Sequence, residues 1–247
     1  MALLWSLVVV DLLIILSTIA CGAVSVVVTL FDTSGDTGVG IARWWARALL
    51  WYARVTVNVE GMEKLQGISA CVLCSNHLSY MDTPVVLSRI PLRFRFLAKS
   101  ELFKIPFMGT HLRQAGHIPV PLENPRAAVK TLTQAAEAIR GRAISLLIFP
   151  EGGRSEDGLL QPFKEGAAYI AIKAQVALVP VAIIGTREVL PMHGKVFRPG
   201  RVRLLVGDPI STAGRMLKDR DALTQEAFRQ VTEMLAREPA GQARQAV

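Results

Sequence analysis

The sequence predicts an α/β protein: a mixed, largely parallel sheet flanked by helices and preceded by an N-terminal membrane-embedded helical segment. After Gly61, short apolar runs alternate with longer helical stretches, which is typical of α/β sheets. Before that point, Leu12 to Phe31 form a run of twenty residues without a charged side chain. Across the chain 51% of residues are hydrophobic and only 19% are charged, so most of its length is expected to be ordered.

The uncharged run predicts a membrane segment. Twenty helical residues, at about 1.5 Å each, can cross a hydrocarbon core of about 30 Å. A secretory signal peptide is the alternative, but no Lys or Arg precedes the run. We expect a retained segment, either spanning or re-entrant, with Asp11 near one interface, and hydrophobic length does not decide between these two arrangements.

Tryptophan, tyrosine and arginine are concentrated in the next stretch, GIARWWARALLWYARVTVNVEG. Arg43, Arg47 and Arg54 are spaced by four and seven residues, which predicts a shared helical face. These residue types suit the headgroup layer; a core helix with a solvated basic edge is the alternative. Because positive charge follows the apolar run and none precedes it, the positive-inside rule places the rest of the chain in the cytoplasm. We expect membrane-anchoring helices at residues 1–58 and an α/β domain at residues 59–247.

Turn and capping signals predict the elements of this domain. Asp82 is expected to cap a helix that has Pro84 in its first turn, and Gly141 is expected to end an Ala-rich helix that starts at Pro125. Strands are expected in the runs ACVLCS (70–75), RFRFLAK (93–99), AGHIPV (115–120), AISLLIFP (143–150), LVPVAIIG (178–185) and RVRLLVGDPI (201–210). Further helices are expected at KEGAAYIAIKAQ (164–175) and from about 221 to 237.

Cys71 and Cys74 form a C-x-x-C pair, a pattern found in metal and redox sites. No second pair of cysteines completes a zinc site. Residues three apart on a strand point to opposite faces of the sheet, so these thiols should not pair with each other. We expect buried structural cysteines in a reducing compartment.

Candidate chemistry begins with the stretch LCSNHLSYMDTP (73–84). His77 follows a predicted strand, and Asp82 lies five residues later at the start of a predicted helix. A carboxylate bound to one ring nitrogen fixes the tautomer of a histidine, and the other nitrogen can then take a proton from an incoming hydroxyl. The alternative is that Asp82 only caps the helix and His77 only ends the strand. Spacing alone leaves both interpretations open.

A second candidate block, LLIFPEGGRSEDG (146–158), favours the chemical interpretation. Its glycines allow backbone N–H groups to approach an anion, and Arg154 can grip a phosphate in a bidentate manner. Glu151 could orient that arginine or an acceptor hydroxyl, and Lys164 adds a cation near the same strand end. Ligands in α/β sheets bind beyond the carboxyl ends of the strands, where both blocks fall. A plain surface turn is the alternative.

Together the two blocks resemble the glycerolipid acyltransferases. NHLSYMD is similar to the family's asparagine-histidine-x4-aspartate signature, and FPEGGRS is similar to its second signature, which usually has threonine in place of Gly153. LVPVAIIGT, with Pro180, resembles a third block, and FLAKSELFKIPFMG and VGDPI also look like family stretches. The resemblance covers roughly residues 57–210 and is strongest to the bacterial 1-acylglycerol-3-phosphate (lysophosphatidic acid) acyltransferases, which implies a bacterial inner membrane.

The resemblance implies an enzyme in which His77 is the general base and Asp82 orients it. The acceptor hydroxyl of a lyso-lipid would attack the thioester of acyl-CoA or acyl carrier protein, with no cofactor, metal or covalent intermediate. Residues implied or considered for binding the substrates are Asn76, Lys99, Arg126, Glu151, Gly152, Arg154, Ser155 and Lys164. The implied partners are membrane lipids, the lyso-lipid and the acyl donor, but no nucleic acid.

One departure from the family pattern concerns the acceptor phosphate. In GHIPVPLENPR, Leu122 stands where the family usually has an arginine that contacts this phosphate. Arg126 and His117 are nearby candidates for replacing it, and Lys99, Lys104 and Arg154 could also carry the anion. An acyltransferase for a different lyso-lipid, or a catalytically silent lipid-binding scaffold, therefore remains as an alternative.

A net charge of +8 and a pI of about 9.8 predict an anionic partner, which is a membrane surface, a nucleic acid or a phosphorylated substrate. Nucleic acid fits poorly, because the basic residues are scattered and the tryptophans lie beside the membrane segment. A hydrolase that uses His77 with water is a further alternative, but the sequence lacks a G-x-S-x-G nucleophile elbow.

Overall fold

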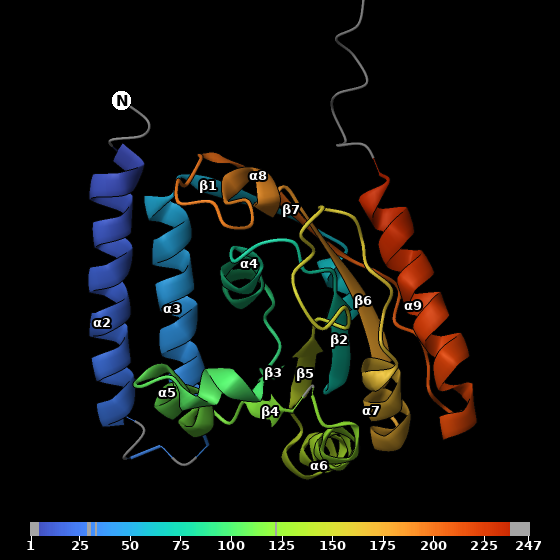
Figure 1. The fold of residues 1–247 in the computed structure, drawn as a ribbon. Helices are drawn as coiled ribbons and strands as arrows, with labels where there is room; N and C mark the ends of the chain where they lie inside the picture. The colour runs from blue at the N-terminus through green and yellow to red at the C-terminus, as the bar shows by residue number, and fades with distance from the viewer. Residues whose placement is uncertain (1–4, 29–30, 33, 122, 238–247) are drawn as a thin grey trace, which may run out of the picture.

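The computed structural model describes residues 5–28, 31–32, 34–121 and 123–237, which fold around a seven-stranded sheet (Figure 1). Its strand order is β1-β7-β6-β2-β5-β3-β4, and all neighbours pair in parallel except β6 and β7. The strands are β1 (Val55–Glu60), β2 (Cys71–Ser75), β3 (Phe94–Lys99), β4 (Ile118–Val120), β5 (Ser145–Ile148), β6 (Ala177–Ile184) and β7 (Gly200–Val206). The predicted fold class, a mixed and largely parallel sheet flanked by helices, is confirmed.

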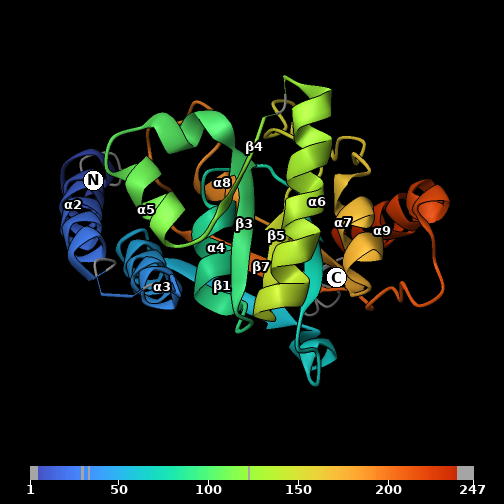
Figure 2. The same ribbon diagram turned by 90° about the horizontal axis from the view of Figure 1, so that it is seen from below.

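Helices cover both faces of the sheet (Figures 1 and 2). The α-helices are α2 (Asp11–Val28), α3 (Asp36–Tyr52), α4 (Asp82–Arg89), α5 (Met108–Gln114), α6 (Pro125–Arg142), α7 (Gly166–Ala174), α8 (Thr186–Val189) and α9 (Arg220–Leu235). Shorter turns are the π-helical η1 (Trp5–Val10) and the 3₁₀ turns η2 (Met62–Leu65), η3 (Ser100–Lys104) and η4 (Leu217–Asp219). Helices α3 and α4 pack on one face, and α6, α7 and α9 pack on the other.

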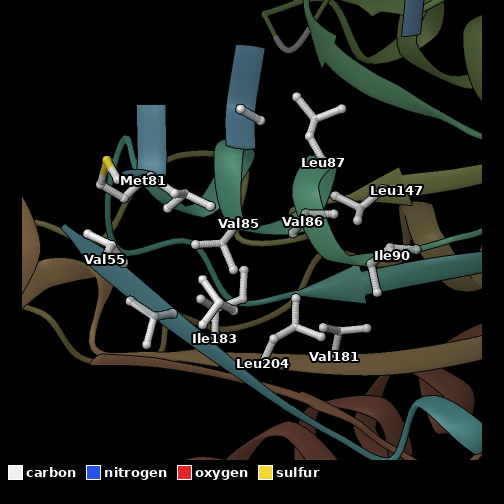
Figure 3. Close-up of a cluster of buried hydrophobic side chains, with 14 of the residues drawn as sticks. Val55, Met81, Val85, Val86, Leu87, Ile90, Leu147, Val181, Ile183 and Leu204 are labelled. Carbon is white, nitrogen blue, oxygen red and sulfur yellow. The ribbon is translucent and has the colours of Figure 1, made fainter. Parts of the chain in front are cut away.

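The core beneath α4 fixes the helix that begins at Asp82. Figure 3 shows apolar side chains of α4 facing Val181 and Ile183 of β6 and Leu204 of β7. All three of these β residues are fully buried. Fully burying a side chain of this size contributes about 1.5–3 kcal/mol. The start of α4 is therefore held against the sheet, close to the carboxyl end of β2.

Strand β2 confirms the expectation for the cysteines. Cys71 packs in the core under α3 and α4, whereas Cys74 packs in the core under α6 and α7. The two thiols are buried, free and on opposite faces of the sheet. Burial raises the pKa of Cys71 to about 11 and raises the pKa of Cys74 still further, so both remain protonated thiols at neutral pH.

Helix α2 forms the outermost layer on the N-terminal side and runs antiparallel to α3 (Figure 1). The stretch Val8–Val28 has a mean hydropathy of 2.3, is long and apolar enough to cross a membrane, and is little buried within the protein. Trp45 of α3 donates a hydrogen bond from Nε1 to Thr18 Oγ1 at 3.0 Å, which joins the two helices. The candidate membrane segment is therefore packed along α3, which itself packs on α4 and the sheet.

Some local expectations were wrong. Helix α3 ends at Tyr52, so Arg54 lies beyond it with φ +54° and does not share a helical face with Arg43 and Arg47. The unexpected strand β1 follows directly, and the expected division between residues 58 and 59 falls within it. Because β1 pairs with β7, this segment belongs to the sheet.

Two expected helix ends also differ. Asp82 is the first residue of α4, and its carboxylate does not cap that helix but accepts N–H groups from the preceding turn. Helix α6 continues through Gly141, and Ala143, with φ +49°, takes the left-handed position after it. Glycine is favoured at such a position but is not required.

Candidate active site

Four neighbouring strands deliver the candidate site residues to one edge of the sheet. His77 follows β2, the loop with Glu151 and Arg154 follows β5, and Lys99 ends β3. Thr186 follows β6 on the other side of β2. Because these four strands are parallel to one another, their carboxyl ends lie together, which is where ligands bind in such sheets.

His77 and Asp82 form a buried pair. Nδ1 of His77 lies 2.8 Å from Oδ2 of Asp82, and the Asp82 side chain is fully buried. An ionised carboxylate can only accept, so Nδ1 carries the proton and Nε2 is the acceptor nitrogen. No described residue forms a hydrogen bond with Nε2, and the His77 side chain keeps 10% of its surface exposed. The pair can therefore take a proton at Nε2.

Several further donors fix the Asp82 carboxylate. Oδ2 also accepts the backbone N–H groups of Leu78 at 2.7 Å and Ser79 at 2.9 Å. Oδ1 accepts the hydroxyl of Thr186 at 2.6 Å, and Thr186 is fully buried. Sequence reasoning missed Thr186, although it stands in the quoted block LVPVAIIGT, because only the sheet order places the end of β6 beside Asp82.

The surroundings of His77 favour the neutral imidazole. Its ring stacks on Phe149 with centroids 3.9 Å apart and an angle of 12° between the planes. Burial lowers the pKa of His77 below 6.5, the interaction with Asp82 opposes that shift, and the positive charges of Arg154 and Lys99 add to it. A neutral ring at pH 7 is the form that a general base needs.

Glu151 joins the two blocks of the site. Its Oε1 accepts the backbone N–H of His77 at 2.5 Å, and its Oε2 accepts the N–H of Gln161 at 2.8 Å. The N–H of Ser155 returns a bond to the carbonyl of His77 at 2.9 Å. Burial raises the pKa of Glu151 to about 7 in spite of these bonds. Glu151 therefore positions the backbone of His77. The sequence offered Arg154 or an acceptor hydroxyl as its partner, and Arg154 is not hydrogen-bonded to it.

Two other side chains that were predicted to contact the substrate form hydrogen bonds within the protein. Asn76 is fully buried, and its side-chain amide pairs with both the N–H and the carbonyl of Ile183 at 2.8 and 2.9 Å. The hydroxyl of Ser155 donates to Asp157 at 2.7 Å and accepts the N–H of Gly158 at 3.1 Å. Both side chains shape the loops that carry His77 and Arg154.

Three cations, Arg154, Lys164 and Lys99, belong to the strand ends and loops around His77. The guanidinium carbon of Arg154 lies 3.9 Å from the centroid of the Tyr80 ring, and its buried Nε has no hydrogen-bond partner among the described residues. Gly152 adopts φ +82°, and the amine of Lys164 fills the space where a Cβ would project. Lys99 is exposed at the end of β3 and acts electrostatically on His77.

The other phosphate-contact candidates lie differently. Leu122 is outside the described residues. Arg126 is exposed at the start of α6. His117 is buried, its Nδ1 accepts the N–H of Phe96 at 2.9 Å, and burial lowers its pKa to about 3, so it carries no charge for a phosphate. At Gly153, where the family usually has threonine, an added Cβ would meet open space, so this departure alters no packing.

A metal site was not expected from the sequence. Within the parts of the chain that the structure describes, no group of three or more His, Cys, Asp or Glu side chains is placed to hold a metal ion.

The chain is similar in sequence to known acyltransferases. Residues 56–184 match the sequence profile of the family described as Acyltransferase. A chloroplastic 1-acyl-sn-glycerol-3-phosphate acyltransferase from Arabidopsis thaliana is 33% identical over 197 residues, covering 79% of this chain and 53% of the relative. The human 1-acyl-sn-glycerol-3-phosphate acyltransferase beta is 29% identical over 209 residues, covering 84% of this chain and 75% of the relative.

A solved structure resembles the whole fold. The crystal structure of the 1-acyl-sn-glycerophosphate (LPA) acyltransferase PlsC from Thermotoga maritima matches with a TM-score of 0.75 and 26% identity, covering 94% of this chain and 98% of that one. This chain spans about half the length of the chloroplastic relatives that it matches. The resemblance to 1-acylglycerol-3-phosphate acyltransferases is confirmed by these names, and the matched profile covers more than half of the residues. The chain belongs to the acyltransferase family.

Proposed function

We propose that this protein is a membrane-bound 1-acylglycerol-3-phosphate O-acyltransferase, which moves a fatty acyl chain from a thioester to lysophosphatidic acid and yields phosphatidic acid. The donor is acyl-CoA or acyl carrier protein. The single observation that carries the proposal is the His77–Asp82 pair, whose Nε2 is bonded by no described residue. It lies near Arg154, whose buried Nε has no hydrogen-bond partner among the described residues. A base and a phosphate-binding cation at the same edge of the sheet suit an acceptor that has both a hydroxyl and a phosphate.

The proposed reaction needs only groups of this chain and the two substrates. Nε2 of His77 takes the proton of the acceptor hydroxyl while the oxygen attacks the thioester carbonyl carbon. Asp82 stabilises the imidazolium that results. Collapse of the tetrahedral intermediate breaks the C–S bond, and the departing thiolate takes the proton from Nε2 to leave as a thiol. His77 is thereby returned to its neutral form.

Phosphate binding is assigned to the cations of the same edge. The charges of Arg154 and Lys99 act on His77, and the amine of Lys164 lies beside Gly152 in the loop that follows β5. The stacking of Arg154 on Tyr80 holds a planar guanidinium in place without using a hydrogen-bond donor, so its N–H groups remain for a ligand. Asp82, Thr186 and Glu151 position the base and do not contact the acceptor.

Membrane attachment is assigned to the apolar N-terminal helix. Only 17% of this apolar stretch, Val8–Val28, is buried within the protein, and a lyso-lipid acceptor and its diacylated product both reside in a bilayer. We place the sheet domain on the cytoplasmic side of a bacterial inner membrane, because positive charge follows the apolar stretch and none precedes it. The thioester donor would reach the site from the cytoplasm.

The proposal is tested by following thiol release from an acyl-CoA and from an acyl carrier protein thioester, with detergent-purified protein. Lysophosphatidic acid and a panel of other lyso-lipids serve as acceptors. Acceptor-dependent release should disappear in His77→Ala and persist in His193→Ala, a matched control because His193 is exposed and outside the site. Preference for another lyso-lipid would revise the acceptor. Failure of every acceptor with both donors would favour a silent lipid-binding scaffold.

A further inference from the structure

An exposed apolar surface lies between the candidate site and the N-terminal helix. We name it the apolar apex and define it as Leu102 of η3, the connecting residues Ile105, Pro106 and Phe107, and Met108 at the start of α5. All five residues are exposed, and 76% of the Phe107 surface is accessible. Single exposed apolar residues are ordinary, but a contiguous group marks an interaction surface.

A tight turn, hydrogen bonds and close packing define the backbone of the apex. Phe107 has φ +62° and ψ −54°, and the N–H of Met108 donates to the carbonyl of Pro106 at 2.7 Å. This geometry is a γ-turn, a strained conformation for a residue with a bulky side chain. Gly109 packs directly on the carbonyl of Phe103, leaving no room for a side chain, and Arg113 donates to that same carbonyl. The strained turn therefore presents the Phe107 ring to the outside from a fixed base.

The apolar apex is joined to helix α2. Helix α5 lies beside α2 in both views (Figures 1 and 2). Ser25 of α2 and Nδ1 of His111 of α5 are 2.6 Å apart in a hydrogen bond. Near that contact, Val24 and Val27 of α2 are more than half exposed. The apolar surface of α2 and the apex thus belong to one side of the molecule.

Basic side chains flank this surface. Lys99 directly before η3 and Lys104 at its end are both exposed, with Glu101 as the acidic residue between them. Apolar side chains edged by lysines are the combination that enters the headgroup and acyl boundary of a bilayer. Lys99 ends β3 directly before η3, so the chain segment that carries the apex leaves the same edge of the sheet as the candidate site.

We propose that the apolar apex is a second bilayer-contact element, which inserts beside α2 and brings the His77 edge to the lipid surface. Its occupant is the phospholipid bilayer. The purpose of the contact rests on the proposed function, because a lipid acceptor must pass from the bilayer to Nε2. The contact itself can be measured without any turnover, so the two proposals can fail separately.

The first test places an environment-sensitive fluorophore on Phe107→Cys in a Cys21→Ser background, since the two remaining cysteines are buried. The protein is reconstituted in vesicles of phosphatidylethanolamine and phosphatidylglycerol with a doxyl-lipid quencher. The matched control is Val129→Cys, which labels an exposed apolar position on α6, away from α2 (Figure 2). We expect a blue shift and strong quenching at position 107 and neither at position 129. Equal emission and quenching at both positions would overturn the proposal. A blue shift at position 107 caused by acyl carrier protein alone, without vesicles, would also overturn it.

The second test compares Phe107→Ser with Val129→Ser, both at exposed positions where serine leaves the core intact. Phe107→Ser should lower the rate with a vesicle-embedded acceptor by about tenfold, as expected for removing one large apolar contact with lipid. Its rate with a short-chain, water-dispersed acceptor should equal that of the unaltered protein, and Val129→Ser should change neither rate. An equal loss with both acceptors would assign Phe107 to the reaction site and overturn the bilayer contact. Quenching without turnover on any lyso-lipid would retain the contact and remove the proposed function.

Discussion

The hydroxyl of Thr186 lies 2.6 Å from Oδ1 of Asp82, on the carboxylate oxygen that His77 does not use. Both residues are fully buried, and they come from positions 104 residues apart in the chain. Oδ2 already serves His77 and two backbone N–H groups, so Thr186 is the described side chain that fixes the rotation of the carboxylate from its other end. Thr186 therefore acts on His77 through Asp82.

Thr186→Val should lower kcat by about tenfold or more. A hydrogen bond to a charged group contributes about 1.5–3 kcal/mol, and valine keeps the shape of the side chain while removing the donor. Without that donor the Asp82 carboxylate stabilises the imidazolium of His77 more strongly. The apparent pKa of the acidic limb of kcat/KM, which reports His77, should therefore move upward. Thr186→Ser keeps the hydroxyl and should retain both the rate and the pH profile. A Val variant with reduced stability but an unaltered profile would limit Thr186 to packing.

The ring of His77 should titrate below pH 6.5. Burial and the neighbouring cations lower its pKa, and a lowered pKa means that the neutral, base-competent form persists to more acidic pH. An NMR titration of ¹³C-labelled histidine between about pH 4 and pH 9, assigned with His77→Gln, measures this directly. A midpoint at or above 6.5 would mean that Asp82 outweighs burial.

The sequence predicted which residues stand at the strand ends but not which of them face the site. The apolar runs fixed the strands β2, β5 and β6, because buried parallel strands are continuous in hydrophobicity. The spacing of His77 and Asp82 left their contact open, the block after β5 favoured it, and the structure contains it, while their chemical role remains a proposal. Asn76 was expected at the substrate, but its amide pairs with the backbone of Ile183, a partner 107 residues away that no local pattern reveals.

The same limit explains the remaining differences. Strand β1 was missed because its residues directly follow the basic, aromatic stretch of α3, although its alternating valines favour a strand, and it pairs with β7. Glu151 was expected to orient Arg154 or an acceptor hydroxyl, but the order β2-β5 places its carboxylate on the N–H of His77. Long-range pairing decided each of these cases.

Leu204→Ala should reduce the free energy of unfolding by about 2–5 kcal/mol, because it opens a cavity in the core beneath α4. Chemical denaturation measures the change. Leu159→Ala is the matched control, since 67% of the Leu159 surface is exposed and its truncation should change stability by no more than about 0.5 kcal/mol. Similar effects of both substitutions would contradict the burial of Leu204.

Glu151 should make stability depend on pH. Its pKa is raised from 4.5 to about 7, so the folded protein binds the proton more tightly than the unfolded chain. The stabilisation linked to this proton is present at pH values below 4.5 and is lost as pH rises through about 7. Glu151→Gln resembles the protonated form, so the melting temperature of the unaltered protein relative to this variant should fall between about pH 5 and pH 8. A constant difference would show that the pKa of Glu151 is not raised.

Arg154→Ala should raise KM for a phosphorylated acceptor by about tenfold or more, since a charge-assisted hydrogen bond contributes about 1.5–3 kcal/mol. The buried Nε of Arg154 has no described partner, and the ring of Tyr80 holds the guanidinium in place. Arg154→Lys keeps the charge but not the planar fork, so it should recover only part of the loss. Lys130→Ala, at an exposed position on α6, is the control for a change in net charge.

With the uncharged acceptor 1-monoacylglycerol, Arg154→Ala and the unaltered protein should have similar rates, because the contact assigned to Arg154 is then absent from both. An equal loss with the two acceptors would place Arg154 at the thioester or in the loop structure instead of at the acceptor phosphate.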